Sequence, residues 1–399
     1  MKPLQNLTIL DLSRVLACPF ASMIMAELGA TVIKVEEPGR GDETRTFEPF
    51  VTREGGRESA YYLAFNRSKR SITVDLRSRE GQEIVRGLAA DADVLLENFP
   101  VGTLARHGLD YAAIRAVNER IVYVSCTGFG QTGPHARRKG YDTIFQAMGG
   151  IMSLTGERGG DPVKPGLPVA DLTSGLWIVI AILAAVHGRD AAGGAGSHVD
   201  FSMLDGQIAL LTLAAARWFA LGEVPQRLGT EHPSRVPTAS FRCADGGWLH
   251  ITGSDQHWMP LCRVLGLEAW GGEPALQQNS ERVRRRDEVM TALTDAIGTR
   301  RRDELAAALD AAGVPQGPIR TVDEIFADEH TRARELVGTF EHPVVGSFPG
   351  LRIPYRFDGF DDPTVDRPPL LGEHTDEILR ERLGYSPERI AALREAKVV

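Results

Sequence analysis

The sequence predicts an α/β protein in which a large domain with a mostly parallel sheet is followed by a smaller α+β domain. Three observations predict this. Over the first 200 residues, short apolar runs alternate with amphipathic stretches of helical length. After residue 221 the chain becomes rich in Gly and Pro, and a hairpin pattern and helices follow. The length of 399 residues also exceeds what one hydrophobic core organises.

The elements of the large domain follow from these runs in chain order. Expected strands are 8–12, 31–35, 71–76, 93–97, 121–126 and 198–201. Expected helices are 20–28 and 80–90, two that begin near 141 and 171, and a long one over 204–221. The alternation predicts helices on both faces of one sheet.

The second half of the chain has a different pattern. Residues 222–237 resemble a linker or functional loop, and 241–252 predict a hairpin that turns at Asp245-Gly246-Gly247. Helices are expected at 258–265, 280–297 and 302–312. We therefore predict a large domain over 1–221, a linker over 222–237, a small domain over 238–330 and a return to the large domain over 331–399.

Composition excludes several classes of function. Hydrophobic residues make up 43% of the chain and charged residues 25%, as in ordinary globular proteins. The net charge of −8 offers no basic surface to nucleic acid. The N-terminus lacks a signal-peptide pattern, and the apolar run 176–186 is shorter than the roughly 20 residues that span a bilayer. We expect a cytoplasmic protein without disulfides and without a nucleic-acid or membrane partner.

Two local motifs are interpreted as having no role in cofactor or phosphate binding. Residues 128–133 match G-x-G-x-x-G, but a polar loop follows them where a dinucleotide site requires a helix. The arginine clusters 284–286 and 300–302 adjoin Asp and Glu, which is typical of a solvated helix face. The histidines and cysteines show no metal-ligand spacing. We expect no metal and no cofactor.

The stretch 169–175 carries one carboxylate, Asp171, between a short apolar run and a strongly apolar helix. Asp is a favoured N-cap residue, so the structural interpretation is that Asp171 only starts the helix. The alternative is that the helix N-terminus keeps Asp171 ionised at the edge of an apolar site. In that case Asp171 is a candidate nucleophile.

Several separated segments resemble the class III CoA-transferases, the CaiB/BaiF family that includes formyl-CoA:oxalate transferase. They are LDLSRVLACP at 10–19, GATVIKVE at 29–36, NRSKRSI at 66–72, ENF at 97–99, YD at 141–142, QA at 146–147, TG at 155–156 and PLLGEHT at 369–375. The resemblance extends from end to end. It implies a Rossmann-like large domain joined to the small domain by two linkers, and a homodimer whose two chains interlock.

By this resemblance, Asp171 stands at the position of the family's aspartate nucleophile. The implied reaction moves CoA between carboxylic acids through an aspartyl anhydride and an aspartyl-CoA thioester, which divides a difficult exchange into easier steps. Each step forms an oxyanion that needs hydrogen-bond donors, and we expect backbone N–H groups near Asp171 or around Leu16 and Ala17 to supply them. CoA is a substrate here and not a bound cofactor.

The resemblance also implies a set of residues that contact CoA or the acyl group. They are Arg14, Val15, Leu16, Ala17, Arg40, Val74, Arg77, Asn98, Phe99, Arg106, Lys139, Tyr141 and Asp142. Arginine and lysine suit the phosphates of CoA. The chain departs from formyl-CoA transferase at Glu37, where that enzyme has an arginine that Arg40 could replace, and at Leu16, where it has an active-site glutamine. Oxalate and formate are therefore not the expected substrates.

The acceptor site is expected in the loop 229–235, which occupies the region of a glycine-rich loop in formyl-CoA transferase. His232 or Arg235 is a candidate to bind the acceptor carboxylate, although both are also ordinary polar loop residues. Family habit suggests succinyl-CoA as the donor and a dicarboxylate as the acceptor.

Two alternative functions remain open. A 2-methylacyl-CoA racemase resembles the chain almost as broadly, but its family has a histidine directly before the aspartate of the segment 140–142, where this chain has Tyr141. A tyrosine with its usual pKa near 10 is a poor base at neutral pH. A CoA-binding protein without turnover would lack the nucleophile, which is present here.

Overall fold

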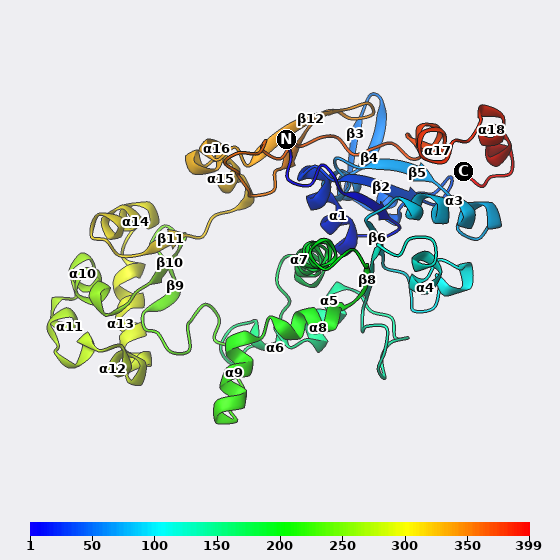
Figure 1. Ribbon diagram of the computed structural model, residues 1–399. Helices are drawn as coiled ribbons and strands as arrows, with labels where there is room; N and C mark the ends of the chain where they lie inside the picture. The colour runs from blue at the N-terminus through cyan, green and yellow to red at the C-terminus, as the bar shows by residue number, and fades with distance from the viewer. The chain divides into compact units, whose positions relative to one another are not determined.

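The computed structural model describes residues 1–399, and the chain divides into two compact units (Figure 1). The larger unit comprises Met1–Ile151, Lys164–Ala215 and Arg332–Val399. The smaller unit comprises Met152–Val163 and Ala216–Thr331. Each unit is therefore assembled from segments that are far apart in the sequence.

A six-stranded parallel sheet forms the centre of the larger unit. Its strands are β1 (Thr8–Asp11), β2 (Thr31–Glu36), β5 (Arg70–Thr73), β6 (Val94–Glu97), β7 (Val122–Thr127) and β8 (Ser197–Ser202). Their order is β5-β2-β1-β6-β7-β8 and every pairing is parallel, which is the strand order of a Rossmann sheet. The predicted parallel α/β sheet is confirmed, and all six predicted strands belong to it.

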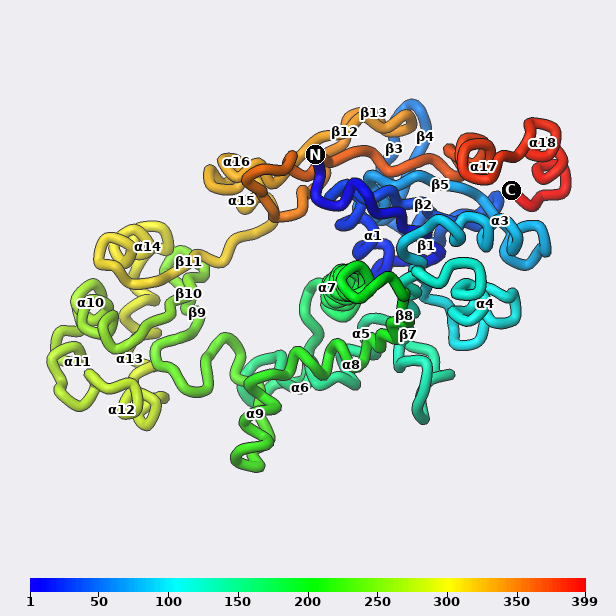
Figure 2. Tube along the Cα trace, viewed as in Figure 1, coloured from blue at the N-terminus to red at the C-terminus, as the bar shows by residue number.

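Helices cover both faces of this sheet, because alternate side chains of its strands point to opposite sides. Ile9 packs with α1 (Ala17–Glu27) and α7 (Val169–Ala191), whereas Leu10 packs with α3 (Arg79–Ala90), α17 (Thr375–Leu383) and α18 (Pro387–Glu395). Figure 2 follows the C-terminal segment, in red, back to the side of β5. There His374 N–H donates to Ser71 O at 2.9 Å.

The remaining elements of the larger unit surround this core. They are β3 (Phe50–Arg53), β4 (Gly56–Ser59), α2 (Ala60–Phe65), α4 (Tyr111–Arg115), α5 (Asp142–Met148), α8 (Met203–Ala209), β12 (Val337–His342) and β13 (Gly346–Leu351), with short 3-10 turns at Glu43–Thr46 and Ala105–His107. Helices α6 (Ile151–Leu154) and α16 (Glu329–Ala333) cross the boundaries to the smaller unit. The hairpins β3–β4 and β12–β13 are antiparallel. Neither hairpin was expected from the sequence.

The smaller unit contains an antiparallel sheet in the order β11-β10-β9. Its elements are β9 (Thr238–Arg242), β10 (Trp248–Thr252), α10 (Asp255–Leu265), α11 (Glu268–Gly272), α12 (Asn279–Arg284), α13 (Arg286–Gly298), α14 (Arg302–Ala311), β11 (Gln316–Pro318) and α15 (Val322–Ala327). The predicted hairpin at Asp245-Gly246-Gly247 is confirmed. The helix expected over 280–297 is in fact α12 and α13, which are separated at Arg285.

Two expectations for the apolar helices are wrong. The helix expected over 204–221 is broken into α8 and α9 (Thr212–Leu221), which meet at 67° near Thr212, whose φ is +20°. The run expected to be too short for a bilayer belongs to a 23-residue helix, α7, which is long and apolar enough to cross one. The pair α8 and α9 passes the same test if taken as one bent span, but core helices of globular proteins also pass it.

Candidate active site

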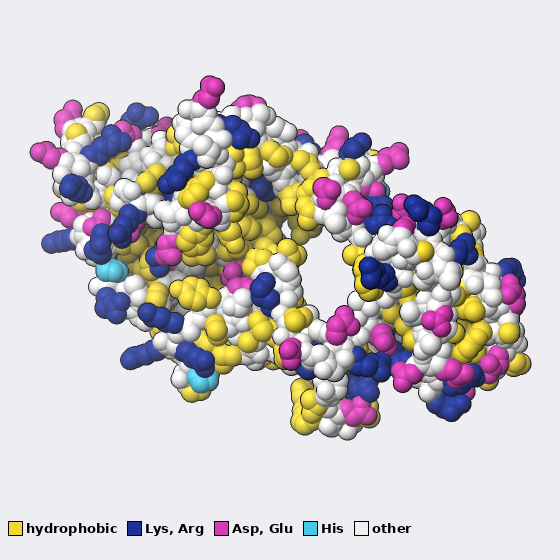
Figure 3. Space-filling model, turned by 180° about the vertical axis from the view of Figure 1, so that it is seen from behind, with side chains coloured by type: hydrophobic (Ala, Val, Ile, Leu, Met, Phe, Trp, Pro, Cys, Tyr) yellow, Lys and Arg dark blue, Asp and Glu magenta, His cyan; other side chains and the backbone are white.

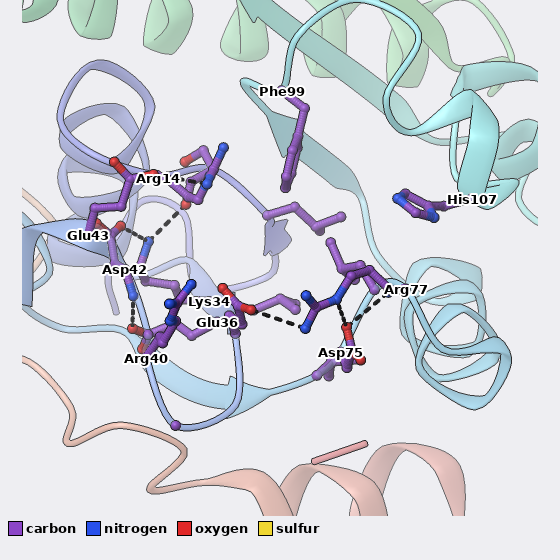
Figure 4. A pocket seen from close by; sticks show the side chains of 18 of the residues that line it. Arg14, Lys34, Glu36, Arg40, Asp42, Glu43, Asp75, Arg77, Phe99 and His107 are labelled. Carbon is purple, nitrogen blue, oxygen red and sulfur yellow. Dashed lines mark hydrogen bonds and ion pairs between the residues drawn. The ribbon is translucent and has the colours of Figure 1, made fainter. Parts of the chain in front are cut away.

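A cavity of about 670 Å³ opens at the carboxyl ends of β1, β2, β5 and β6 in the larger unit. Ligands of Rossmann sheets bind at this edge, where the strand order reverses. Five residues predicted to bind CoA line the cavity: Arg14, Arg40, Val74, Arg77 and Phe99 (Figure 4). The structure thus brings together positions that are far apart in the sequence.

The cavity combines cationic side chains with an apolar wall. Arg14 pairs with Glu43 at 2.9 Å and lies 4.9 Å from the ring centre of Phe99. Arg77 pairs with Asp75 at 2.8 Å and with Glu37 at 3.1 Å. Guanidinium groups suit phosphates, and apolar and aromatic surfaces suit a purine base. The cavity therefore has the chemistry that the nucleotide end of CoA requires.

Arg106 does not line this cavity, whereas its neighbour His107 does. The Arg106 guanidinium donates to Thr103 Oγ1 at 3.4 Å. The resemblance gave no signal for His107, and only the course of the 3-10 turn at Ala105–His107 places it there.

The turn 13–17 connects the cavity to α1 and has a strained backbone. Val15 has φ +71°, a left-handed conformation that is a clear outlier for a β-branched residue. Such a conformation costs on the order of 1–3 kcal/mol and persists only where the surroundings enforce it. Here Asn98 accepts from Arg14 N–H at 2.9 Å and donates to Arg14 O at 2.7 Å. Asn98 thus holds backbone next to the cavity.

Asp171 lies in the first turn of α7, two residues after the helix begins at Val169. The interpretation of Asp171 as the N-cap is wrong, because Pro168 holds that position without a side-chain cap. Asp142 of α5 caps the helix instead, since its Oδ1 accepts from Ala170 N–H at 2.9 Å and Asp171 N–H at 3.1 Å. Gln146 Nε2 donates to the other oxygen of Asp142 at 2.6 Å. The Asp171 carboxylate therefore does not cap the helix.

The surroundings of Asp171 disfavour its charged form. Burial, together with the smaller effect of the neighbouring Asp142 carboxylate, raises the pKa of Asp171 to about 7. A carboxylate of higher pKa is a stronger nucleophile once ionised, and strongly perturbed carboxyl groups are concentrated at functional sites. The geometry and charge of this position support a reactive group.

Helix α1, which follows the turn 13–17, packs against α7, the helix that carries Asp171. Gly175 lies one helical turn after Asp171, on the same face of α7. A Cβ atom at Gly175 would lie 2.8 Å from Ala17 O and 2.8 Å from Phe20 Cδ1. The first turn of α1 therefore touches α7 one turn after Asp171. No hydrogen bond in the chain uses the N–H groups of Leu16 and Ala17, so both are available as donors.

The other predicted residues occupy different surroundings. Lys139 is exposed, and Tyr141 is 79% exposed at the start of α5. His232 lies in the smaller unit, where its Nδ1 accepts from Ser234 N–H at 3.2 Å and Arg286 donates to its carbonyl at 2.9 Å. Its contact with an acceptor carboxylate stays a prediction. No group of three or more His, Cys, Asp or Glu side chains in the chain could hold a metal ion.

Comparisons with known proteins agree with this geometry. The chain is 40% identical over 402 residues to the succinyl-CoA:glutarate CoA-transferase of Homo sapiens, covering 100% of this chain and 90% of that protein. It is 41% identical over 386 residues to the succinate–glutarate CoA-transferase of Agrobacterium fabrum, covering 95% of each. A crystal structure of a CaiB/BaiF family protein from Brucella suis matches with a TM-score of 0.85 at 42% identity, over 96% of this chain and 99% of that one.

The family model for CoA-transferase family III matches residues 4–375, nearly the whole chain. The relatives are similar along nearly their full lengths, so the likeness is not confined to one domain. The chain belongs to CoA-transferase family III, and it is a transferase enzyme.

Proposed function

We propose that this enzyme transfers CoA from succinyl-CoA or a similar acyl-CoA to a dicarboxylate, with Asp171 as the nucleophile. The observation that carries the proposal is a half-buried carboxylate of raised pKa in the first turn of α7. One turn further on, α7 touches the first turn of α1, which follows the turn 13–17 at the edge of the cavity. The larger unit thus offers a candidate nucleophile, free N–H donors and a pocket with three arginines, Arg14, Arg40 and Arg77.

The reaction begins when Asp171 attacks the thioester carbonyl. The C–S bond breaks, CoA thiolate leaves and a mixed anhydride remains. The thiolate then attacks the aspartyl carbonyl, releases the donor acid as a carboxylate and leaves an aspartyl-CoA thioester. The acceptor carboxylate attacks this thioester, and the same two steps run in reverse to free Asp171. Leu16 and Ala17 N–H are the proposed donors to each oxyanion.

The relatives support the choice of a dicarboxylate acceptor. Those from H. sapiens and A. fabrum are named for succinyl-CoA or succinate with glutarate, and one from Haloarcula hispanica, 34% identical, for succinyl-CoA and mesaconate. Leu16 is apolar and only 3% exposed, which removes a polar anchor for a very small diacid. We therefore propose a four- or five-carbon dicarboxylate as acceptor.

Trapping with hydroxylamine tests the proposed nucleophile. Incubation with succinyl-CoA and hydroxylamine should add roughly 15 Da to the peptide containing Asp171, since NHOH replaces OH at an activated carbonyl. Asp171→Asn is the control and should take up no label. Deuterium exchange at the α-carbon of a branched acyl-CoA without any label would instead support the racemase alternative, for which exposed Tyr141 offers no base.

We also propose a cytoplasmic homodimer with two interlocked chains and two linkers between the domains. All four cysteines are buried and unpaired, which suits a reducing compartment. Apolar side chains of α7 lie at the surface of the larger unit, namely Leu176, Trp177, Ile180 and Leu183. Figure 3 shows apolar side chains gathered on one face of the larger unit. Patches of this kind mark protein contacts, and a second copy is the proposed partner.

A further inference from the structure

A buried ion pair lies behind the strained turn 13–17. Lys34 of β2 is 0% exposed, and its Nζ lies 2.8 Å from Asp42 Oδ2. The same Nζ donates to Ser13 O at 2.9 Å. Figure 4 shows Lys34 and Asp42 side by side at the base of the cavity, near Arg14. The Lys34 ammonium is thus enclosed by groups of the protein.

Asp42 also holds Val15 of the turn. Its Oδ1 accepts from Val15 N–H at 3.3 Å and from Thr44 N–H at 2.9 Å. The pair Lys34–Asp42 therefore holds Ser13 O and Val15 N–H, while Asn98 holds both backbone groups of Arg14. One of these anchors holds Val15 itself, which has the left-handed φ of +71°, and the others hold the two residues before it.

Both partners stay charged at neutral pH. Although burial opposes its charge, the Asp42 carboxylate and other nearby acids raise the pKa of Lys34. The Lys34 ammonium likewise outweighs burial and lowers the pKa of Asp42 to about 2. A buried pair of this kind is weak evidence for a gain in stability, since desolvation offsets the attraction. The effect of the pair lies instead in the backbone groups that it holds, Ser13 O and Val15 N–H.

We infer that the Lys34–Asp42 pair is a positioning device for CoA transfer: it keeps Val15 in its left-handed conformation, and this aims Leu16 and Ala17 N–H at the site beside Asp171. The inference rests on the proposed function. Neither side chain is a catalytic residue, because both act through the backbone of the turn. Loss of the pair should lower kcat and leave KM for the acyl-CoA nearly unchanged.

A double-mutant cycle with Val15→Gly tests this inference. Glycine adopts φ +71° without strain. A turn with glycine at position 15 should therefore keep its conformation even without the Lys34–Asp42 pair. We expect Lys34→Met to lower kcat about 100-fold, as for loss of an oxyanion donor, and to change KM for succinyl-CoA less than about 3-fold. Adding Val15→Gly should then restore kcat at least about 10-fold relative to Lys34→Met alone.

The matched control is a second buried ion pair that lies away from the turn. Arg67 pairs with Glu27 at 2.9 Å, and both are nearly inaccessible to solvent. Arg67→Met should reduce thermal stability, but Val15→Gly should not rescue it. If Lys34→Met does not fold, Asp42→Asn addresses the same question, because its amide keeps an acceptor for Val15 N–H but loses the charge that orients Lys34.

Three results would overturn the inference. The first is that the effects of Lys34→Met and Val15→Gly on kcat are additive. The second is that Val15→Gly rescues Arg67→Met as much as Lys34→Met, and the third is that Lys34→Met raises KM and leaves kcat unchanged. The last would make Lys34 a ligand of CoA. Hydroxylamine trapping on the wild-type enzyme separates this failure from failure of the proposed function. A wild-type enzyme that labels at Asp171 keeps the function intact, whatever the cycle shows.

Discussion

The raised pKa of Asp171 predicts the pH dependence of the reaction. Only the ionised carboxylate attacks, so kcat/KM for the acyl-CoA should rise with pH and level off above a midpoint of about 7. Asp142→Asn keeps an oxygen to accept from Ala170 and Asp171 N–H but removes the repelling charge. Its midpoint should therefore move to lower pH. A midpoint unchanged in Asp142→Asn would contradict the assigned contribution of Asp142.

The same carboxyl predicts how stability depends on pH. The unfolded chain loses this proton near pH 3.8 and the folded chain near 7, so the unfolded state binds fewer protons between these values and folding is progressively disfavoured. Asp171→Asn removes this cost. Its Tm should exceed that of the wild type by roughly 2–6 °C at pH 7 and above, and the difference should shrink toward pH 4. A difference independent of pH would contradict this account.

The sequence points to Asp171 as the candidate nucleophile, and this role stays a prediction, whereas the surroundings of Asp171 could not be predicted at all. The resemblance pointed to Asp171 because the motif is local. The cap that Asp142 provides is not local, since it comes from 28 residues upstream. The ion pair of Lys34 and Asp42 was likewise missed, because a lysine in an apolar strand and an aspartate in a loop carry no joint signal in the sequence.

Among the elements, those with buried apolar runs were predictable and those set by distant packing were not. Strand β7 is buried at all six positions and was evident from its composition. Strand β12 alternates exposed and buried residues as a one-sided strand should, but the pattern is short and was missed. The break between α8 and α9 lies in an apolar stretch without Gly or Pro. No residue type near the break therefore predicts it.

Close packing of α1 against α7 predicts a specific effect of Gly175→Ala. The added Cβ would meet Ala17 O at 2.8 Å, and because that atom is backbone, one of the helices must move. We expect a loss of about 1–3 kcal/mol in the free energy of unfolding, together with a lower kcat as the turn 13–17 shifts from Asp171. Denaturant titration and steady-state kinetics measure the two effects.

Gly188 provides the control within the same helix. A Cβ at Gly188 would meet nothing within 4 Å, and alanine favours helix over glycine by about 1 kcal/mol. Gly188→Ala should therefore stabilise the protein slightly and leave kcat unchanged. Equal effects of the two substitutions would mean that the contact between α1 and α7 does not determine the site.

For the whole molecule, pairings between remote segments decide which residues fold together. Residues 152–163 belong to the smaller unit, although they precede α7. Gly229 N–H donates to Gly156 O at 2.8 Å, and Arg227 donates to Gly160 O at 2.9 Å across 67 positions of sequence. The periodicity of a sequence indicates local structure. It therefore cannot predict that residues 152–163 pair with the segment around residue 229.

If α7 contacts a second copy, as proposed, a charged residue on its exposed apolar face should prevent two chains from assembling as they fold. Ile180 is 56% exposed, and a buried glutamate at its position in a dimer would lack a partner for its charge. Light scattering after size exclusion should give twice the chain mass of 43.5 kDa for the wild type and a single chain mass for Ile180→Glu.

A matched substitution away from α7 separates loss of this contact from a general effect of added charge. Val117 is 46% exposed and follows α4, and Val117→Glu should stay dimeric because it leaves the face of α7 intact. A monomeric wild-type enzyme would show that this face does not bind a second copy, whereas a single chain mass for both variants would mean that the contact does not depend on α7. Since Asp171 lies in the first turn of the same helix, failure to assemble should also lower the kcat of Ile180→Glu, whereas Val117→Glu should keep the wild-type kcat.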